Sequence, residues 1–160
     1  MPQKSKKGFT IIEVVLVLAI AGLIFLMVFI ALPNMQRSQR DTQRRQDYAA
    51  LSSNITNYIT NNNGRLPSGT LSASVYINKD GKDPRGNAYT LTVVEAVAET
   101  TPANLSAMTT GSPTVYVVTH ADCSGTNATD GTARPKKNSA SRSFAIYGQL
   151  ETGTYCQASE

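Results

Sequence analysis

The chain has 160 residues and a formal net charge of +4, and 41% of its residues are hydrophobic. This length suits one domain with one modest core. Three of the 15 basic residues, Lys4, Lys6 and Lys7, precede Phe9, so the remainder carries 12 basic against 11 acidic side chains and gives little support to nucleic-acid binding as the main function.

An apolar run occupies residues 9–32 and is interrupted only by Thr10, Glu13 and Gly22. As a helix rising about 1.5 Å per residue, it is long enough to cross a hydrocarbon core of roughly 30 Å. The sequence after Pro33 is polar and has no second run of that length. The chain is therefore expected to cross a membrane once and to carry one soluble domain.

Glu13 is the unusual residue of this run, because an ionised carboxylate at membrane depth costs on the order of 2.5 kcal/mol or more. One interpretation places it near the interface, close to the leading lysines, where it reaches water. The other is that a cationic partner meets it in an assembly. The residue type and its position leave both interpretations open.

The segment KKGFTIIEVV resembles the processing site of type IV prepilins and pseudopilins, in which a short basic leader and a glycine precede an aromatic residue and a glutamate at a fixed offset. The resemblance is strongest over residues 4–67 and covers the rest only as architecture. It implies cleavage between Gly8 and Phe9 by a membrane aspartic peptidase, and N-methylation of Phe9. A secretory signal peptide is disfavoured, because the apolar run is too long and no small-residue cleavage site follows it.

The resemblance also implies that Glu13 pairs with the Phe9 amine of a neighbouring subunit during assembly. Cleavage would create a new ammonium four residues from the carboxylate, and two buried charges are less costly paired than alone. In major pilins a glycine and a proline bracket a helical segment that melts in the filament, and Gly22 and Pro33 are the corresponding residues here. The proline lies a few residues later than in most of the family, and both residue types are also ordinary in membrane helices.

Residues 34–62 follow a helical pattern whose apolar side chains recur at three- and four-residue spacing, at Tyr48, Leu51, Ile55, Tyr58 and Ile59. The turns from Gln36 to Gln46 are polar all round and are predicted to stand exposed. The run from Asn61 to Gly64 is predicted to end the helix.

Beyond the helix, residues 82–89 indicate a turn, and they resemble the Asp-Pro-x-Gly-x-x-Tyr turn of pseudopilins and Gram-positive-type pilins. Strands are predicted at 74–78, 89–98, 115–119 and 144–150, with loops at 99–113 and 121–142. The run 115–119 is mostly apolar and is predicted to be a central strand. The expected fold class is α+β, the type IV pilin fold, in which a long helix packs through its C-terminal half on an antiparallel sheet of about four strands.

Cys123 and Cys156 are the two cysteines of the chain. Such a pair is expected to form a disulfide in an oxidising compartment, although two free buried thiols remain the alternative. A bridge would enclose the last predicted strand, as in the cysteine-bracketed region of many major pilins, and the chain-entropy model gives it roughly 4 kcal/mol. A zinc site is disfavoured, because His120 is the single histidine and the ligands are too few.

No nucleophile–base arrangement is visible, so we expect neither an enzyme nor a cofactor or metal site. Oxygen-bearing side chains in the loop after residue 121 match no fixed calcium motif, and an ordinary loop is preferred for Asp122, Ser124, Asn127 and Asp130. Outside the leader and the helix the chain has one basic cluster, Arg134, Lys136, Lys137 and Arg142. A solvated loop is the preferred interpretation of this cluster, and DNA capture is the alternative.

The predicted organisation is a leader peptide at 1–8, a transmembrane and assembly helix at 9–33, an amphipathic helix at 34–62 and a sheet domain at 63–160. The resemblance implies a structural subunit, by preference a major pilin, of a bacterial type IV pilus used for adhesion, twitching motility or DNA uptake. The alternative is a pseudopilin or minor pilin of a type II secretion or competence system. A membrane-tethered module that never polymerises is disfavoured by Glu13.

The partners that the resemblance implies are further copies of the chain, the prepilin peptidase, the pilus assembly platform with its ATPase, and the membrane. DNA or a host surface has weak support from the basic cluster. The precursor is expected in the cytoplasmic (inner) membrane with its N-terminus in the cytoplasm and its C-terminal domain outside, and the mature chain in an extracellular pilus.

Overall fold

The computed structural model describes residues 8–96, 108, 111–124 and 134–159. The predicted leader, except Gly8, therefore lies outside the described residues. The chain divides into two compact units, residues 1–36 and 37–160. Helix α1, Ile11–Asn61, contributes its first turns to one unit and its last turns to the other.

The first unit consists, in its described part, of the start of α1 and the three residues before it. Its large apolar side chains are all exposed, from 44% at Val28 to 90% at Phe9. Among the described residues, α1 is the one helix that is long and apolar enough to cross a membrane. The helix continues through Gly22 and Pro33 without a break, and its predicted melting, which concerns the filament, stays a prediction.

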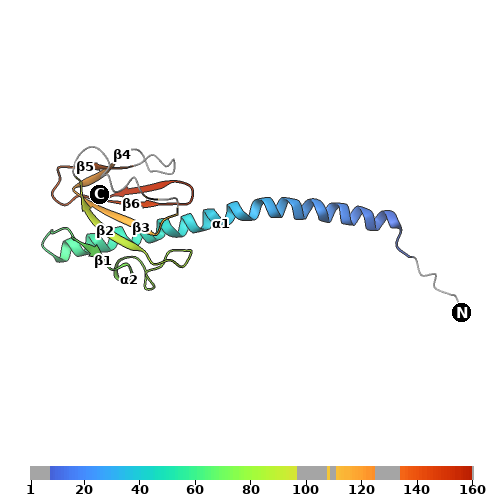
Figure 1. Ribbon diagram of the computed structural model, residues 1–160, viewed down its shortest axis with the longest axis horizontal. Helices are drawn as coiled ribbons and strands as arrows, with labels where there is room; N and C mark the ends of the chain where they lie inside the picture. The colour runs from blue at the N-terminus through green and yellow to red at the C-terminus, as the bar shows by residue number, and fades with distance from the viewer. Residues whose placement is uncertain (1–7, 97–107, 109–110, 125–133, 160) are drawn as a thin grey trace. The chain divides into compact units, whose positions relative to one another are not determined.

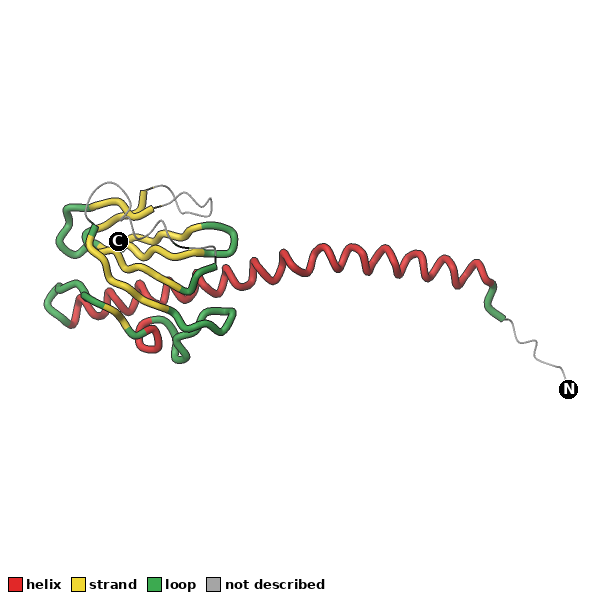
Figure 2. The backbone as a smooth tube through the Cα atoms, viewed as in Figure 1, coloured by secondary structure: helices red, strands yellow, loops and turns green. Residues whose placement is uncertain are grey.

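The second unit is built on a five-stranded sheet with the order β1-β2-β3-β6-β7 (Figures 1 and 2). Its strands are β1 (Thr70–Leu71), β2 (Thr90–Glu95), β3 (Thr114–Thr119), β6 (Phe144–Gln149) and β7 (Thr154–Ala158). A separate two-stranded sheet consists of β4 (Ala121–Ser124) and β5 (Arg134–Lys137). The predicted α+β class and the central position of the 115–119 strand are confirmed.

The prediction of an antiparallel sheet of about four strands is wrong. Strands β2 and β3 run parallel, with Leu91 opposite Val115 and Val93 opposite Val117, so the larger sheet is mixed. Parallel neighbours need a connection of about a dozen residues or more. The segment between Glu95 and Thr114 supplies that length.

Further local predictions also need correction. The predicted strand at 74–78 is instead helix α2, Ala73–Tyr76. Its turn buries Ala73 and Ile77, which are four residues apart, while Val75 between them is 70% exposed. The predicted loop 121–142 contains β4 and β5, and β6 is followed by another strand, β7. These strands were not predicted because their sequences are short and mostly polar.

The last turns of α1 pack on one face of the larger sheet. The predicted apolar stripe is confirmed there, since Tyr48, Leu51 and Ile55 are fully buried against Leu91, Val115, Val117, Phe144 and Ile146. The opposite face carries a second, smaller core that joins Val118, Ala145 and Tyr147 to Ala121 of β4. Figure 1 shows β4 and β5 on the side of the sheet away from α1, so both faces are covered.

A disulfide joins Cys123 on β4 to Cys156 on β7. It therefore links the two sheets, and the loop that it closes contains β5 and β6. The bridge is placed where it holds the small polar hairpin, which has little core of its own, on the main sheet. Loop closure of this length is worth roughly 4 kcal/mol in the chain-entropy model.

The predicted end of the long helix is also confirmed. Helix α1 ends at Asn61, and Asn63 and Gly64 both take positive φ, 55° and 81°. The amide of Gly64 donates to the carbonyl oxygen of Ile59 at 2.8 Å, which satisfies one of the free carbonyls of the last turn.

Candidate functional site

The first candidate site is the start of α1, residues 8–14. The helix begins at Ile11, and Thr10 precedes it as the N-cap. The Thr10 amide donates to Glu13 Oε2 at 2.8 Å, and the Thr10 hydroxyl donates to the same oxygen at 2.8 Å. In return, the Glu13 amide lies 3.4 Å from Thr10 Oγ1. This reciprocal arrangement is a capping box, with Glu13 at the third helical position.

Apolar residues flank the capping box on both sides. Phe9 occupies the position before the cap and Val14 the fourth position of the helix, which are the two positions of a hydrophobic staple. Together with Glu13, Val17 and Leu18 they line a shallow recess on the helix. Glu13 is the one charged residue in that lining, so the recess is apolar with a single anionic edge.

The residues at the predicted cleavage point lie outside the helix and are exposed. A Cβ added at Gly8 would meet no atom within 4 Å, and the same holds at Gly22. The subunit's own structure therefore does not require glycine at position 8. A requirement for glycine there must come from a protein that acts on this segment.

The capping box could have been read from the sequence, because Thr10 and Glu13 have the Thr-x-x-Glu spacing and precede an apolar run. The sequence interpretation weighed Glu13 only as an interfacial residue or as half of an intermolecular ion pair. In the subunit Glu13 already has a partner on its own chain, Thr10.

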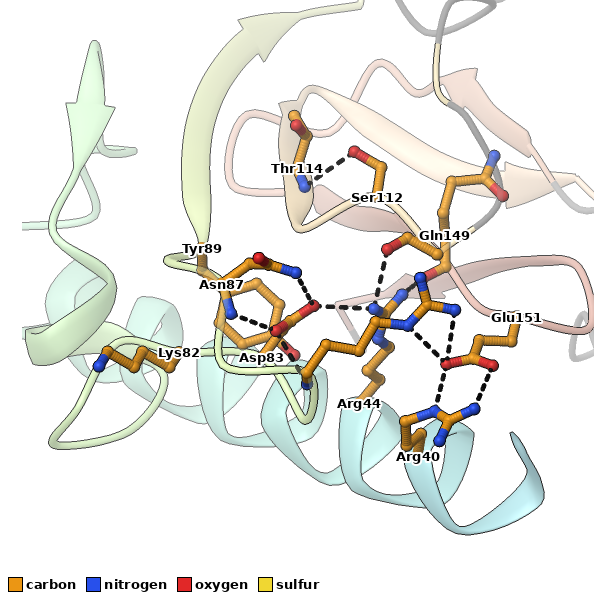
Figure 3. A network of polar contacts seen from close by, with 12 residues as sticks. Arg40, Arg44, Lys82, Asp83, Asn87, Tyr89, Ser112, Thr114, Gln149 and Glu151 are labelled. Atoms are coloured by element: carbon orange, nitrogen blue, oxygen red, sulfur yellow. Dashed lines mark hydrogen bonds and ion pairs between the residues drawn. The ribbon is translucent and has the colours of Figure 1, made fainter. Parts of the chain in front are cut away.

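The second candidate site is a buried polar cluster in unit 37–160, centred on Arg44 (Figure 3). The Arg44 side chain is fully buried and forms an ion pair with Asp83 at 2.9 Å, Nη2 to Oδ2. Its guanidinium also donates to the carbonyl oxygens of Gln149, at 2.9 Å, and Gly111, at 2.8 Å. One side chain of α1 thus contacts three segments that are far apart in the sequence, at Asp83, Gly111 and Gln149.

Asp83 organises the turn that was predicted at 82–89, and that prediction is confirmed. Its Oδ1 accepts hydrogen bonds from the amides of Arg85, at 3.0 Å, and Asn87, at 2.7 Å. Gly86 takes a positive φ of 86°, which glycine adopts without strain. The other oxygen of Asp83 faces Arg44, so the turn is closed locally and fastened to α1 by the same carboxylate.

The turn between β6 and β7 is fastened to α1 by two further charged groups. Glu151 lies between Arg40, with Nη2 to Oε2 at 2.9 Å, and Arg85, with Nη2 to Oε1 at 3.0 Å. Asp41 accepts from the amides of Glu151, at 2.7 Å, and Thr152, at 3.1 Å. The hydrogen bond from Arg40, followed by those from Arg85, lowers the pKa of Glu151 to about 2.

Asp47 completes the cluster one turn further along α1. It accepts hydrogen bonds from the Tyr89 hydroxyl, at 2.9 Å, and from the side-chain amide of Asn78, at 3.3 Å. Burial raises the pKa of the Asp47 carboxyl, and these hydrogen bonds oppose the rise. Tyr89 and Tyr48 lose solvent on folding, and burial raises the pKa of both hydroxyls.

These contacts overturn the prediction that the turns from Gln36 to Gln46 stand exposed. Asp41 is 5% and Arg44 0% exposed. Burial of the helix was predicted from the spacing of its apolar side chains. The buried side chains of these turns are charged, so that spacing gave no sign of their burial. Buried charges are tolerated only when they are paired and hydrogen-bonded, and the partners come from turns that the helix sequence does not contain.

The remaining sequence candidates are dispersed. His120 follows β3 with a positive φ of 53°, and its Nδ1 lies 3.7 Å from Glu95 Oε1. Of the candidate calcium oxygens, Asp122 Oδ1 accepts from the Cys123 amide and the Ser124 hydroxyl donates to the Arg134 carbonyl. Asn127 and Asp130 lie outside the described residues. No group of potential metal ligands occurs in the described part of the chain.

The basic cluster of the sequence is divided in the structure. Arg134, Lys136 and Lys137 are exposed on β5, where Lys136 pairs in register with Asp122 of β4. Arg142 lies elsewhere, with its guanidinium over Gly64 at the end of α1. Three of the four cations therefore share β5, and the fourth contacts the end of α1.

Comparison with known proteins finds a match over the segment that contains the first site. A family model described as the prokaryotic N-terminal methylation motif matches residues 3–29. This motif is the class III prepilin leader of type IV pilins and pseudopilins. The match spans the proposed cleavage point, the capping box and most of the apolar run. No curated protein and no solved structure matches the chain.

The chain therefore carries a prokaryotic N-terminal methylation motif over residues 3–29, and its fold, a long N-terminal helix and a mixed sheet, is consistent with the type IV pilin fold. The leader implies processing by a prepilin peptidase and polymerisation of the product. It also implies a membrane-anchored precursor.

Proposed function

We propose that this chain is a prepilin whose mature form is the structural subunit, by preference the major pilin, of a bacterial type IV pilus. The observation that carries the proposal is the N-terminal methylation motif, which covers the start of α1; over residues 11–36 the large apolar side chains are all exposed and the one acidic residue is Glu13. An apolar surface of this extent needs either lipid or other subunits to cover it. A subunit that moves from the membrane into a filament core finds both in turn.

In the proposed processing, residues 1–8 are removed by cleavage between Gly8 and Phe9, and the new Phe9 amine is methylated. Residues 9–33 then anchor the subunit in the cytoplasmic membrane, and residues 34–160 form the domain outside. The exposed position of the cleavage point before the helix supports this step, since a peptidase needs an extended segment.

In the proposed assembly, the ammonium of Phe9 of one subunit meets the Glu13 carboxylate of another. The recess lined by Phe9, Glu13 and Val17 supports this pairing, because it offers one anionic edge in apolar surroundings. In a medium without water each charge is costly alone and the pair is less so. In such a filament the exposed apolar side chains of one subunit's helix would be buried against the helices of neighbouring subunits.

The polar cluster around Arg44 has a mechanical role in this proposal. A fibre subunit transmits load between its helix and its domain, and the cluster fastens α1 to the turn 83–87 and to the turn 149–152. The disulfide holds the hairpin β4–β5 to the main sheet. Both devices would keep the domain closed on an extracellular fibre, where adhesion, twitching motility or DNA uptake are the proposed uses.

A pseudopilin of a type II secretion system or a competence system is the second candidate. The segment from Asp83 to Tyr89 is compatible with it, since this segment folds into a carboxylate-closed turn and resembles the Asp-Pro-x-Gly-x-x-Tyr turn frequent in both pseudopilins and Gram-positive-type pilins. The two candidates share processing and assembly and differ in the length and abundance of the fibre.

The proposal is tested by fibre counts with three forms of the full chain, expressed with a prepilin peptidase and an assembly system. Wild-type protein should form surface fibres in which this chain is the bulk component. Glu13→Val should remain membrane-inserted and cleaved, because the apolar run becomes more hydrophobic, yet should form few fibres. Glu95→Val, an exposed glutamate of β2, is the matched control and should assemble normally.

Normal fibre numbers with Glu13→Val would reduce Glu13 to an interfacial residue and defeat the proposed assembly mechanism. Fibres that contain this chain only as a trace component would defeat the major-pilin assignment and favour a minor pilin or a pseudopilin.

A further inference from the structure

The two oxygens of Glu13 are not equivalent in the subunit. Oε2 accepts both the amide and the hydroxyl of Thr10, each at 2.8 Å. Among the described residues, Oε1 accepts no hydrogen bond. The carboxylate is therefore oriented by one residue of its own chain and left open on one side, next to the apolar recess that Val14, Val17 and Leu18 help to line.

We propose that Thr10 is a positioning residue for Glu13, which holds Oε2 so that Oε1 receives the ammonium of a second copy of the chain. This inference rests on the proposed function, since it takes the pairing of Glu13 with Phe9 as given. It adds that the acceptor is pre-oriented before the partner arrives, and that the side chain of Thr10 does the orienting.

Pre-orientation matters because a glutamate side chain on an exposed helix has several rotatable bonds. Ordering it at the moment of association would oppose binding, and an interaction made beforehand within the subunit removes that cost. Hydrogen bonds to a carboxylate are stronger than those between neutral groups, and more so where water is scarce. Both Thr10 donors act on the same oxygen, which fixes the plane of the carboxylate.

The same contacts also fix where Phe9 lies. Because Thr10 is the N-cap, the helix begins at Ile11 and Phe9 lies outside it. In a lipid environment the first amides of a helix find no water, so the carboxylate that satisfies the Thr10 amide also keeps this helix start in place. The capping box of Thr10 and Glu13 thus positions both the free oxygen of Glu13 and Phe9, the residue that would bear the new amine.

A simpler role for Thr10 is that of a helix cap with no connection to pairing. The two roles differ in how a change at Thr10 combines with a change at Glu13. If Thr10 acts through Glu13, its hydroxyl has nothing left to orient once the carboxylate is gone. If Thr10 only caps the helix, its loss adds to the loss of Glu13.

The test uses the full chain with its peptidase and assembly system, and measures sheared fibre per processed subunit in the membrane fraction. Thr10→Val has nearly the same shape but lacks the hydroxyl, and should lower assembly about tenfold, the effect of one hydrogen bond to a charged group. Thr10→Ser keeps the hydroxyl and should stay within about twofold of wild type. Thr42→Val is the matched control, since the Thr42 hydroxyl bonds only within α1, to the Ser38 carbonyl.

The decisive comparison is the double variant Thr10→Val with Glu13→Gln, which should assemble no worse than Glu13→Gln alone. Where Glu13→Gln leaves too few fibres to compare, ¹³C NMR of the Glu13 carboxyl in micelles replaces the count. Thr10→Val should shift that resonance and Thr10→Ser should restore it, whereas Thr42→Val should leave it unchanged.

Wild-type assembly or an unshifted Glu13 resonance in Thr10→Val would overturn the inference, as would a further loss in the double variant. If Glu13→Gln abolishes fibres while Thr10→Val does not reduce them, this inference fails and the proposed function stands. If Glu13→Gln assembles like wild type, the proposed pairing itself fails.

Discussion

Replacing Arg44 by methionine should destabilise the domain far more than any exposed arginine replacement. The variant keeps much of the side-chain volume but leaves the fully buried Asp83 carboxylate without its cation. It also leaves the carbonyl oxygens of Gln149 and Gly111 without this donor. Removing one partner of a buried ion pair costs on the order of 3–5 kcal/mol, which is a large share of the roughly 5–15 kcal/mol that holds a typical domain folded.

The assay is thermal unfolding of the full chain in detergent micelles, followed by near-ultraviolet circular dichroism of the tyrosines packed around Tyr48. For a domain of this size about 1 kcal/mol shifts Tm by roughly 3–5 °C, so Arg44→Met should lower Tm by about 10–20 °C. Arg37→Met is the matched control, because Arg37 is exposed on the same helix, and it should shift Tm by no more than a few degrees. Equal shifts in the two variants would refute the view that the Arg44 cluster fastens the domain to α1.

Three further predictions concern pH, redox state and processing. The folded-state pKa of Glu151, about 2 against an ordinary 4.5, means that the unfolded chain binds the proton first; stability should therefore fall between about pH 4.5 and pH 2, and Glu151→Gln should flatten this part of the profile. The raised pKa of Asp47 has the opposite effect on stability, which should rise as Asp47 is protonated. An unchanged profile in Glu151→Gln would contradict the view that Glu151 causes the loss of stability at low pH. Reduction of the Cys123–Cys156 bridge should lower Tm by about 10 °C or more, from the roughly 4 kcal/mol of loop closure, and two alkylatable thiols in untreated protein would rule the bridge out. Gly8→Ala should block processing while leaving the fold unchanged, because the subunit itself has room for the Cβ; normal cleavage of that variant would remove the reason for glycine at this position.

The sequence was most informative where one local pattern decides the structure. The apolar run, the end of α1 at Asn61 and the turn closed by Asp83 each follow from residues within a few positions of one another. The strand at 115–119 was predicted because a continuous apolar run needs burial on both faces, and β3 has a core on each side. The start of the helix was equally local, since Thr10 and Glu13 are three residues apart.

Apart from the Cys123–Cys156 bridge, the features that depend on distant partners were mostly not predicted. Arg44 looks like a solvated charge until Asp83, 39 residues away, and the carbonyl of Gln149 are brought to it. The parallel pairing of β2 with β3 joins strands that are distant in the sequence, and the alternation of side chains within a strand does not show in which direction its neighbour runs. The hairpin β4–β5 buries only a few side chains, among them Ala121 and Pro135, so its strands carry no alternating apolar signal.

The central claim, that this chain is a prepilin processed at one peptide bond and then assembled, is tested most directly by mass spectrometry of sheared surface fibres. The account predicts an N-terminal peptide that begins at Phe9 and carries one methyl group on its amine. An N-terminus at any other residue, or an unprocessed chain that begins upstream of Gly8 in the fibres, would contradict it.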